Sequence, residues 1–116
     1  GKMNMQNFTK VCGLIVVVAC ALPSCVRAED TVVDLRFENR RFSPQTFTVP
    51  VNQPFRIKLL NASKEVIEFE SFKLNREKVV GPGETVTIFL PALKPGRYDF
   101  YDDFHQDVPQ GIINVK

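Results

Sequence analysis

Sulfur-containing residues are missing from most of this chain of 116 residues. All three cysteines (Cys12, Cys20 and Cys25) and both methionines (Met3 and Met5) precede residue 26, and tryptophan is absent throughout. The residues that follow therefore have no disulfide, no thiolate and no thioether that could bind a metal ion. Because they also contain a single histidine, they offer little for covalent catalysis.

Motifs of several enzyme classes are also missing. The chain has no serine or cysteine nucleophile elbow, no Walker loop and no dinucleotide-binding fingerprint. The apolar run Val11–Leu22 is shorter than the roughly 20 residues that a helix needs to span a bilayer. We therefore expect neither a hydrolase or nucleotide-binding enzyme of these kinds nor a retained transmembrane anchor.

The N-terminal region has the layout of a secretory signal peptide. Two lysines precede the apolar run, and a proline then leads into small residues that end at Ala28. We predict a signal peptide over residues 1–28, with Gly1-Lys2 as a non-native addition, and an exported periplasmic domain over residues 29–116. The alternative is a lipoprotein leader with lipidation at Cys25, which the neighbouring proline disfavours.

Cleavage at Ala28 would change the net charge. Three of the 15 basic residues lie in the leader and all 13 acidic residues lie beyond it, so the domain has a net charge of −1 rather than +2. No basic patch with interleaved aromatic residues remains to indicate a nucleic-acid partner. We expect no nucleic-acid binding, and no direct membrane insertion once the leader is removed.

Alternation of apolar and polar residues dominates residues 29–116. A period of two is typical of strands with one buried face, and no amphipathic helical pattern is long enough to predict a helix. Turn-forming Asn, Gly and Pro separate the apolar runs. The predicted strands are Val32–Phe37, Phe47–Val49, Phe55–Leu59, Val66–Phe72, Val86–Leu90, Arg97–Tyr101 and Gly111–Val115. About seven short strands at this spacing predict an all-β Greek-key sandwich.

Phenylalanines dominate the predicted core of this sandwich. Each large apolar side chain that becomes fully buried contributes roughly 1.5–3 kcal/mol to folding. One core of this kind is sufficient to fold a single domain without disulfides. The phenylalanines expected in it are Phe37, Phe42, Phe47, Phe55, Phe69, Phe72 and Phe100.

Several segments resemble a known family. The first half is similar to cupredoxin-like domains at Phe42-Ser43-Pro44, Phe47-Thr48-Val49-Pro50, Pro54–Ile57 and Asn61-Ala62-Ser63. The second half resembles the periplasmic cupredoxin-like proteins that accompany bacterial high-affinity iron permeases, at Glu68-Phe69-Glu70-Ser71, Leu74–Val80, Leu93–Phe100, Phe104-His105 and Gly111. The resemblance implies a cupredoxin-like β-sandwich that binds copper and helps to oxidise Fe(II) before uptake. It also implies a membrane iron permease complex as a partner. Because the sequence shows no second redox centre, we also expect a redox partner that removes the electron from the copper.

The chemistry of the available ligands limits the metal site. A blue-copper centre needs two histidines and a cysteine, often with an axial methionine, and residues 29–116 offer only His105. We therefore exclude a blue-copper electron carrier and predict a non-blue site. Asp102 and His105, three residues apart in the last loop, can meet across a tight turn, and Glu68 or Glu70 can add a third donor. The predicted metal ligands are Glu68, Asp102 and His105.

Nitrogen and carboxylate donors of this kind suit Cu(II), which the Irving–Williams order favours over Fe(II) and Mn(II). Simpler interpretations exist for some of the acidic residues. Aspartates in turns are usually solvated, which we prefer for Asp103 and Asp107, and Glu68 also fits an outward polar strand position. The predicted function is a ferroxidase-like electron-transfer role with iron as the substrate ion. The alternative is a non-redox metal carrier or a structural module of a transport complex.

Overall fold

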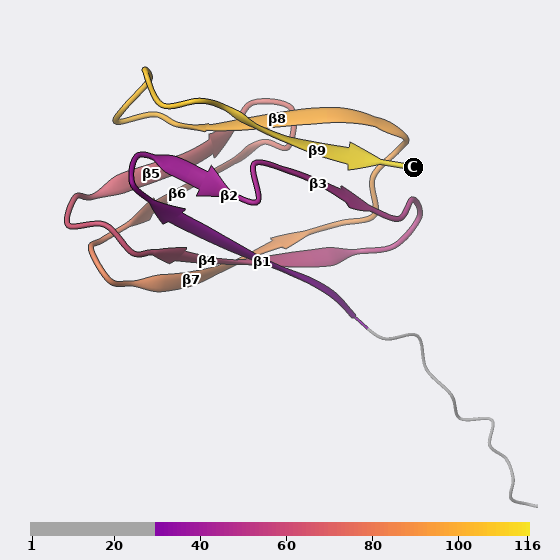
Figure 1. The fold of residues 1–116 in the computed structure, drawn as a ribbon. Helices are drawn as coiled ribbons and strands as arrows, with labels where there is room; N and C mark the ends of the chain where they lie inside the picture. Colours follow the sequence, from indigo (N-terminus) through magenta and orange to yellow (C-terminus); the bar gives the residue numbers. More distant parts are fainter. Residues whose placement is uncertain (1–29) are drawn as a thin grey trace, which may run out of the picture.

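The computed structural model describes residues 30–116 of the chain. They form nine strands arranged in two layers (Figure 1). The strands are β1 (Thr31–Glu38), β2 (Arg41–Ser43), β3 (Thr46–Val49), β4 (Phe55–Asn61), β5 (Ile67–Ser71), β6 (Arg76–Val80), β7 (Thr85–Leu90), β8 (Gly96–Asp102) and β9 (Gly111–Val115). The predicted all-β sandwich is confirmed, with β2 and β6 as two strands that the alternation did not predict.

The predicted leader over residues 1–28 lies outside the described residues. Within the described range, no helix is long and apolar enough to cross a membrane. All nine strands and the whole core discussed below lie between Thr31 and Val115, so a protein of residues 29–116 contains the complete sandwich.

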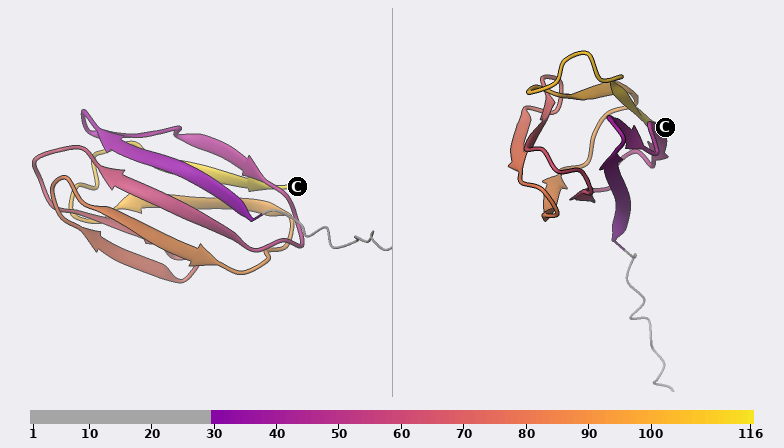
Figure 2. Two further views of the ribbon diagram at one scale, coloured as in Figure 1. Left: turned by 90° about the horizontal axis from the view of Figure 1, so that it is seen from below. Right: turned by 60° about the vertical axis from the view of Figure 1, so that its left-hand side comes forward.

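The two layers are a four-stranded sheet in the order β2-β1-β4-β7 and a five-stranded sheet in the order β3-β9-β8-β5-β6. Two neighbouring pairs are parallel, β1 with β4 and β3 with β9, and the other pairs are antiparallel. The consecutive strands β2 and β3 belong to different sheets, so the chain crosses between the layers near Pro44 (Figure 2).

Aromatic rings fill the space between the sheets. The ring of Phe100 on β8 packs edge-on against Phe42 from the opposite sheet and stacks with Phe69, with ring centroids 5.1 and 5.2 Å apart. Aromatic pairs at such distances contribute about 0.5–1.5 kcal/mol beyond the area that they bury. A Cβ atom on Gly111 would lie 2.1 Å from Cζ of Phe100, so only glycine leaves room for this ring.

One predicted core residue is wrong. Phe72 is 87% exposed, because the inward positions of β5 are the odd-numbered ones and the strand ends at Ser71. The chain turns at once, and Leu74, 6% exposed, enters the core from that turn instead. The hydroxyl oxygen of Ser71 accepts a hydrogen bond from the Leu74 N–H and fixes the turn.

Candidate metal centre

Asp102, the last residue of β8, is the buried anchor of the candidate site. Its side chain points inward like that of Phe100 and is fully buried. One carboxylate oxygen, Oδ1, accepts hydrogen bonds from the backbone N–H groups of Glu68 and Phe104, each at 3.0 Å. The other oxygen, Oδ2, lies 2.7 Å from Nδ1 of His105. Three donors therefore surround this carboxylate, which ties β8 to β5 and to the following loop.

The His105 ring lies between two carboxylates. Nδ1 faces Asp102, and Nε2 lies 2.7 Å from Oε1 of Glu65 in the loop between β4 and β5. Because the Asp102 carboxylate serves as an acceptor, the proton of this pair is assigned to Nδ1 of the ring. At 2.7 Å from Oε1 of Glu65, Nε2 is the donor of a second hydrogen bond, and the Glu65 side chain that accepts it is 62% exposed. A metal ion at Nε2 would take the place of that proton. Histidines that bind metals usually hold their second nitrogen in this way.

Asn61 fixes the loop that carries Glu65. Its buried side-chain amide donates hydrogen bonds to the backbone oxygens of Glu65 and Val80, at 2.7 and 3.0 Å. Its side-chain oxygen accepts from the N–H and the hydroxyl of Ser63. Sequence reasoning missed Glu65, although the Asn-x-Ser turn two residues earlier was the signal that could have identified it.

Glu68 lies in a separate group of carboxylates. Oxygens from Glu68, Glu70 and Asp103 all lie within 4.8 Å of one another, on the outer face of the five-stranded sheet. Burial raises the pKa of both glutamates, and so does repulsion from the neighbouring carboxylates, including Glu77. The same causes, burial first, raise the pKa of the adjacent Tyr101.

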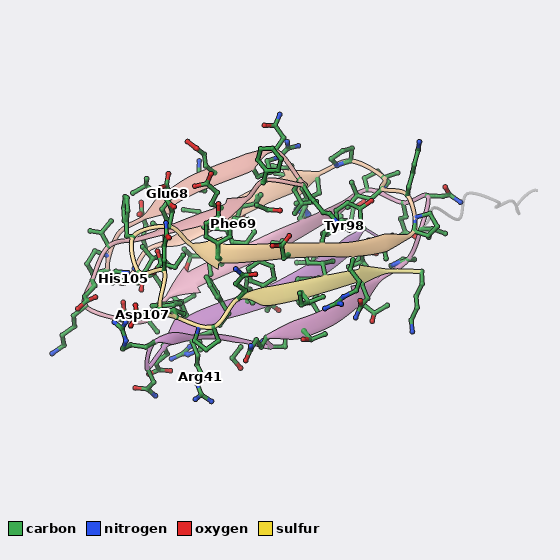
Figure 3. All side chains as sticks on the ribbon, turned by 90° about the horizontal axis from the view of Figure 1, so that it is seen from above. Arg41, Glu68, Phe69, Tyr98, His105 and Asp107 are labelled. Atoms are coloured by element: carbon green, nitrogen blue, oxygen red, sulfur yellow. The ribbon has the colours of Figure 1, made fainter. Side chains whose placement is uncertain are left out.

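The structure therefore brings two of the three predicted ligands together. Asp102 and His105 meet as their spacing predicts, whereas Glu68 contacts Asp102 through its backbone N–H and directs its carboxylate into the outer group. Figure 3 shows Glu68 and His105 toward the same end of the sandwich. The role of these residues as metal ligands stays a prediction.

The remaining aspartates of the last loop have partners of their own. Asp107 forms a 2.6 Å ion pair with Arg40, and this hydrogen bond holds the pKa of Asp107 below its usual value. Asp103 accepts a hydrogen bond from the side chain of Gln106 at 2.8 Å.

Comparison with known families decides the identity of this sandwich. Residues 10–115 match the family model of the cupredoxin-like domain. The chain belongs to the cupredoxin-like domain family. An uncharacterized protein of Rickettsia prowazekii (strain Madrid E) is 38% identical to this cupredoxin-like protein over 91 residues, which cover 77% of this chain and 73% of the relative.

Solved structures agree with this assignment at the level of the fold. The metal binding domain of the Cu(I) exporting P-type ATPase CopA of Streptococcus pneumoniae D39 has a TM-score of 0.67 at 16% identity, with 78% of this chain and 91% of that chain covered. Auracyanin of Roseiflexus castenholzii has a TM-score of 0.64 at 19% identity, with 77% and 99% covered. The purple cupredoxin of Nitrosopumilus maritimus has a TM-score of 0.55 at 16% identity, with 75% and 100% covered.

The donor set of this cupredoxin-like domain does not fit a blue-copper centre. Residues 30–116 contain one histidine and neither cysteine nor methionine, so a thiolate and a second imidazole are missing from this range. The set does fit a non-blue site with one nitrogen and carboxylate oxygens. His105 supplies the nitrogen at Nε2, and Glu65 is the carboxylate already in contact with it.

Proposed function

We propose that this cupredoxin-like protein is exported to the periplasm, holds one Cu(II) ion at a non-blue site on His105, and takes part in the oxidation and uptake of ferrous iron. One observation carries the proposal: the buried Asp102 carboxylate holds Nδ1 of the ring and leaves Nε2 directed at the exposed Glu65.

Three side chains have distinct roles in the proposed site. Nε2 of His105 binds the ion, and the carboxylate of Glu65 is its neighbouring oxygen donor. Asp102 orients the ring, because both of its oxygens already accept hydrogen bonds and its side chain is fully buried. Orienting groups of this kind typically change metal affinity by 10–100-fold when they are removed.

Support for copper comes from the family and from fold neighbours such as the CopA domain, whose described complex contains Cu(I). When bound, Cu(II) supplies a one-electron acceptor, so each Fe(II) oxidised to Fe(III) delivers one electron that a redox partner has to remove. The chain contributes the acidic group of Glu68, Glu70 and Asp103, which attracts the Fe(II) substrate, and Glu68 of this group lies toward the same end of the molecule as His105 (Figure 3). The resemblance to proteins of iron permease systems supports a membrane permease complex as the partner.

The first experiment titrates Cu(II) into residues 29–116 by calorimetry and electron paramagnetic resonance. Glu65→Gln and Glu68→Gln form a matched pair, because each removes one carboxylate. We expect one site, lost in His105→Ala and weakened at least tenfold in Glu65→Gln, with little change in Glu68→Gln. Full binding by His105→Ala would contradict the proposed site, and a loss confined to Glu68→Gln would restore the ligand set predicted from sequence.

The second experiment mixes the copper-loaded protein with Fe(II) without oxygen. One Fe(III) per copper is expected for the redox function. Fe(II) that binds and stays reduced would instead support the alternative, a non-redox metal carrier, which the all-oxygen group of Glu68, Glu70 and Asp103 favours. Glu70→Gln should then weaken Fe(II) binding while leaving the copper site unchanged.

A further inference from the structure

A second surface of the molecule has the opposite character to the candidate metal centre. It surrounds the end of β7 and the beginnings of β4, β6 and β8, and it contains five basic residues: Arg56, Lys73, Arg76, Lys94 and Arg97. We call these residues the basic surface. Asp30, Glu70 and Glu77 are acidic residues that border it. In Figure 3, Tyr98, which neighbours this surface, and His105 lie toward opposite ends of the sandwich.

Two groups of contacts hold the residues of the basic surface. Nε of Arg76 donates to the backbone oxygen of Phe89, and Phe89 is the strand neighbour of Arg56. The Lys73 ammonium donates to the backbone oxygen of Arg97 at 2.9 Å and lies 5.8 Å from the centre of the Tyr98 ring. The hydroxyl of Tyr98 in turn donates to the backbone oxygen of Lys94. The first group of contacts joins β6 to β7 and β4, and the second joins the turn after β5 to β8 and the segment before it.

Two exposed phenylalanines lie among these cations. Phe72 is 87% exposed and Phe89 is 64% exposed, and Arg76 lies between them because it lines a surface hollow with each. Arg56 on β4 pairs with Phe89 on β7, and its Nε atom is buried without a hydrogen-bond partner. Cations interleaved with projecting aromatic side chains are typical of proteins that bind at the surface of an anionic membrane.

The N-terminal segment joins the domain at the same surface. Oδ2 of Asp30 lies 3.9 Å from the Arg56 guanidinium, one residue before β1 begins. Cys25, the alternative lipidation position, precedes Asp30 by five residues, which span at most about 18 Å when fully extended. If the chain were held through that cysteine, the alternative that the sequence disfavours, the basic surface would lie within this distance of the membrane.

We propose that the basic surface docks onto an anionic lipid bilayer. The cations contact lipid phosphates, and the Phe72 and Phe89 rings enter the headgroup layer. The His105 end then faces away from the lipid and stays open to soluble ions and proteins. The docking needs no metal, so it stands apart from the proposed copper site.

The test measures binding of residues 29–116 to sedimented vesicles in the presence of EDTA. Vesicles of phosphatidylcholine with phosphatidylglycerol are compared with vesicles of phosphatidylcholine alone. Each cation near an anionic surface contributes about fivefold to the partition coefficient. Lys94→Gln with Arg97→Gln should therefore weaken binding to the anionic vesicles by about 25-fold, and Phe72→Ser should weaken it further.

Matched controls come from the opposite end. Arg41→Gln with Lys64→Gln gives the same net charge, and Phe104→Ser removes a ring that is 50% exposed near His105. These variants should bind like the unaltered domain, and so should His105→Ala. If the two double variants lost vesicle binding equally, the attraction would depend on net charge and not on the basic surface, and the proposal would be overturned. Absence of binding to anionic vesicles would also overturn it and would leave an acidic protein as the partner for this surface.

Discussion

Replacement of Asp102 by asparagine should keep the sandwich folded while changing which nitrogen of His105 carries the proton. The asparagine oxygen can still accept from the Glu68 and Phe104 N–H groups, whereas its NH2 group would face Nδ1. A neutral ring then accepts at Nδ1 and carries its proton on Nε2, where it donates to Glu65. A metal ion at Nε2 would force the ring proton onto Nδ1, where it meets the NH2 group of the asparagine, so we expect Cu(II) affinity to fall by about 10–100-fold.

The cost in stability follows from the three hydrogen bonds. Each bond to a charged acceptor contributes about 1.5–3 kcal/mol, and a neutral one about 0.5–1.5 kcal/mol. Asparagine turns all three into neutral bonds, a loss of about 3–4.5 kcal/mol that is partly offset because a neutral amide costs less to bury than a carboxylate, so Asp102→Asn should lower the free energy of unfolding by about 1–3 kcal/mol. Asp102→Ala leaves two backbone N–H groups and the ring without an acceptor, and should lower it by about 3–5 kcal/mol. For a domain of this size, each 1 kcal/mol corresponds to a fall in Tm of about 4–8 °C.

Urea unfolding of residues 29–116 in EDTA measures both stability losses, and calorimetry with Cu(II) measures the affinity of the folded variants. Asp102→Asn should lose most of its Cu(II) affinity while it keeps most of its stability. If Asp102→Asn binds Cu(II) as tightly as the unaltered domain, the orienting role of Asp102 is refuted. Asparagine keeps an acceptor for the two backbone N–H groups and alanine removes it. Equal stability losses for the two variants would therefore show that these two hydrogen bonds do not stabilise the domain.

Three further predictions concern other parts of the domain. Glu70→Gln should raise Tm at neutral pH and lose this advantage below about pH 4. Burial and neighbouring carboxylates raise the pKa of Glu70 above 4.5, so protonation of Glu70 favours the folded state. Thermal unfolding across this pH range checks the prediction, and a higher Tm that persists in acid would contradict it. Gly111→Ala should lower the free energy of unfolding by about 3 kcal/mol, because the new Cβ would overlap the Phe100 ring. An unchanged free energy of unfolding in urea would refute the overlap. Asn61→Ala should lower the free energy of unfolding by about 2–4 kcal/mol and weaken Cu(II) binding, because two backbone oxygens lose their donor and the loop that carries Glu65 is no longer fixed. Unchanged Cu(II) affinity would show that this loop does not contribute to the metal site.

Alternation of apolar and polar residues was enough to predict most strands because each sheet has one face on the core. It failed at β2, which has three residues, and at β6, an edge strand whose residues 77–79 are all exposed. It also placed Phe72 in the core, because alternation alone does not show at which residue a strand ends.

The contact between Asp102 and His105 was predictable from a spacing of three residues across a tight turn. The approach of Glu65 was not, because it depends on how the loop after β4 packs against the loop after β8, 40 residues later. Glu68 shows the reverse case. Its carboxylate follows the outward direction of its strand position, and only its backbone N–H reaches Asp102.

The position of β9 has a consequence for how the protein is made. This last strand inserts between β3 and β8, and β3 has no other strand neighbour. Thr46 pairs with Ile112, so the five-stranded sheet cannot close until β9, more than 60 residues after β3, has been synthesised. Contacts at such long separations form slowly, so β3 stays without a strand partner until β9 has been added.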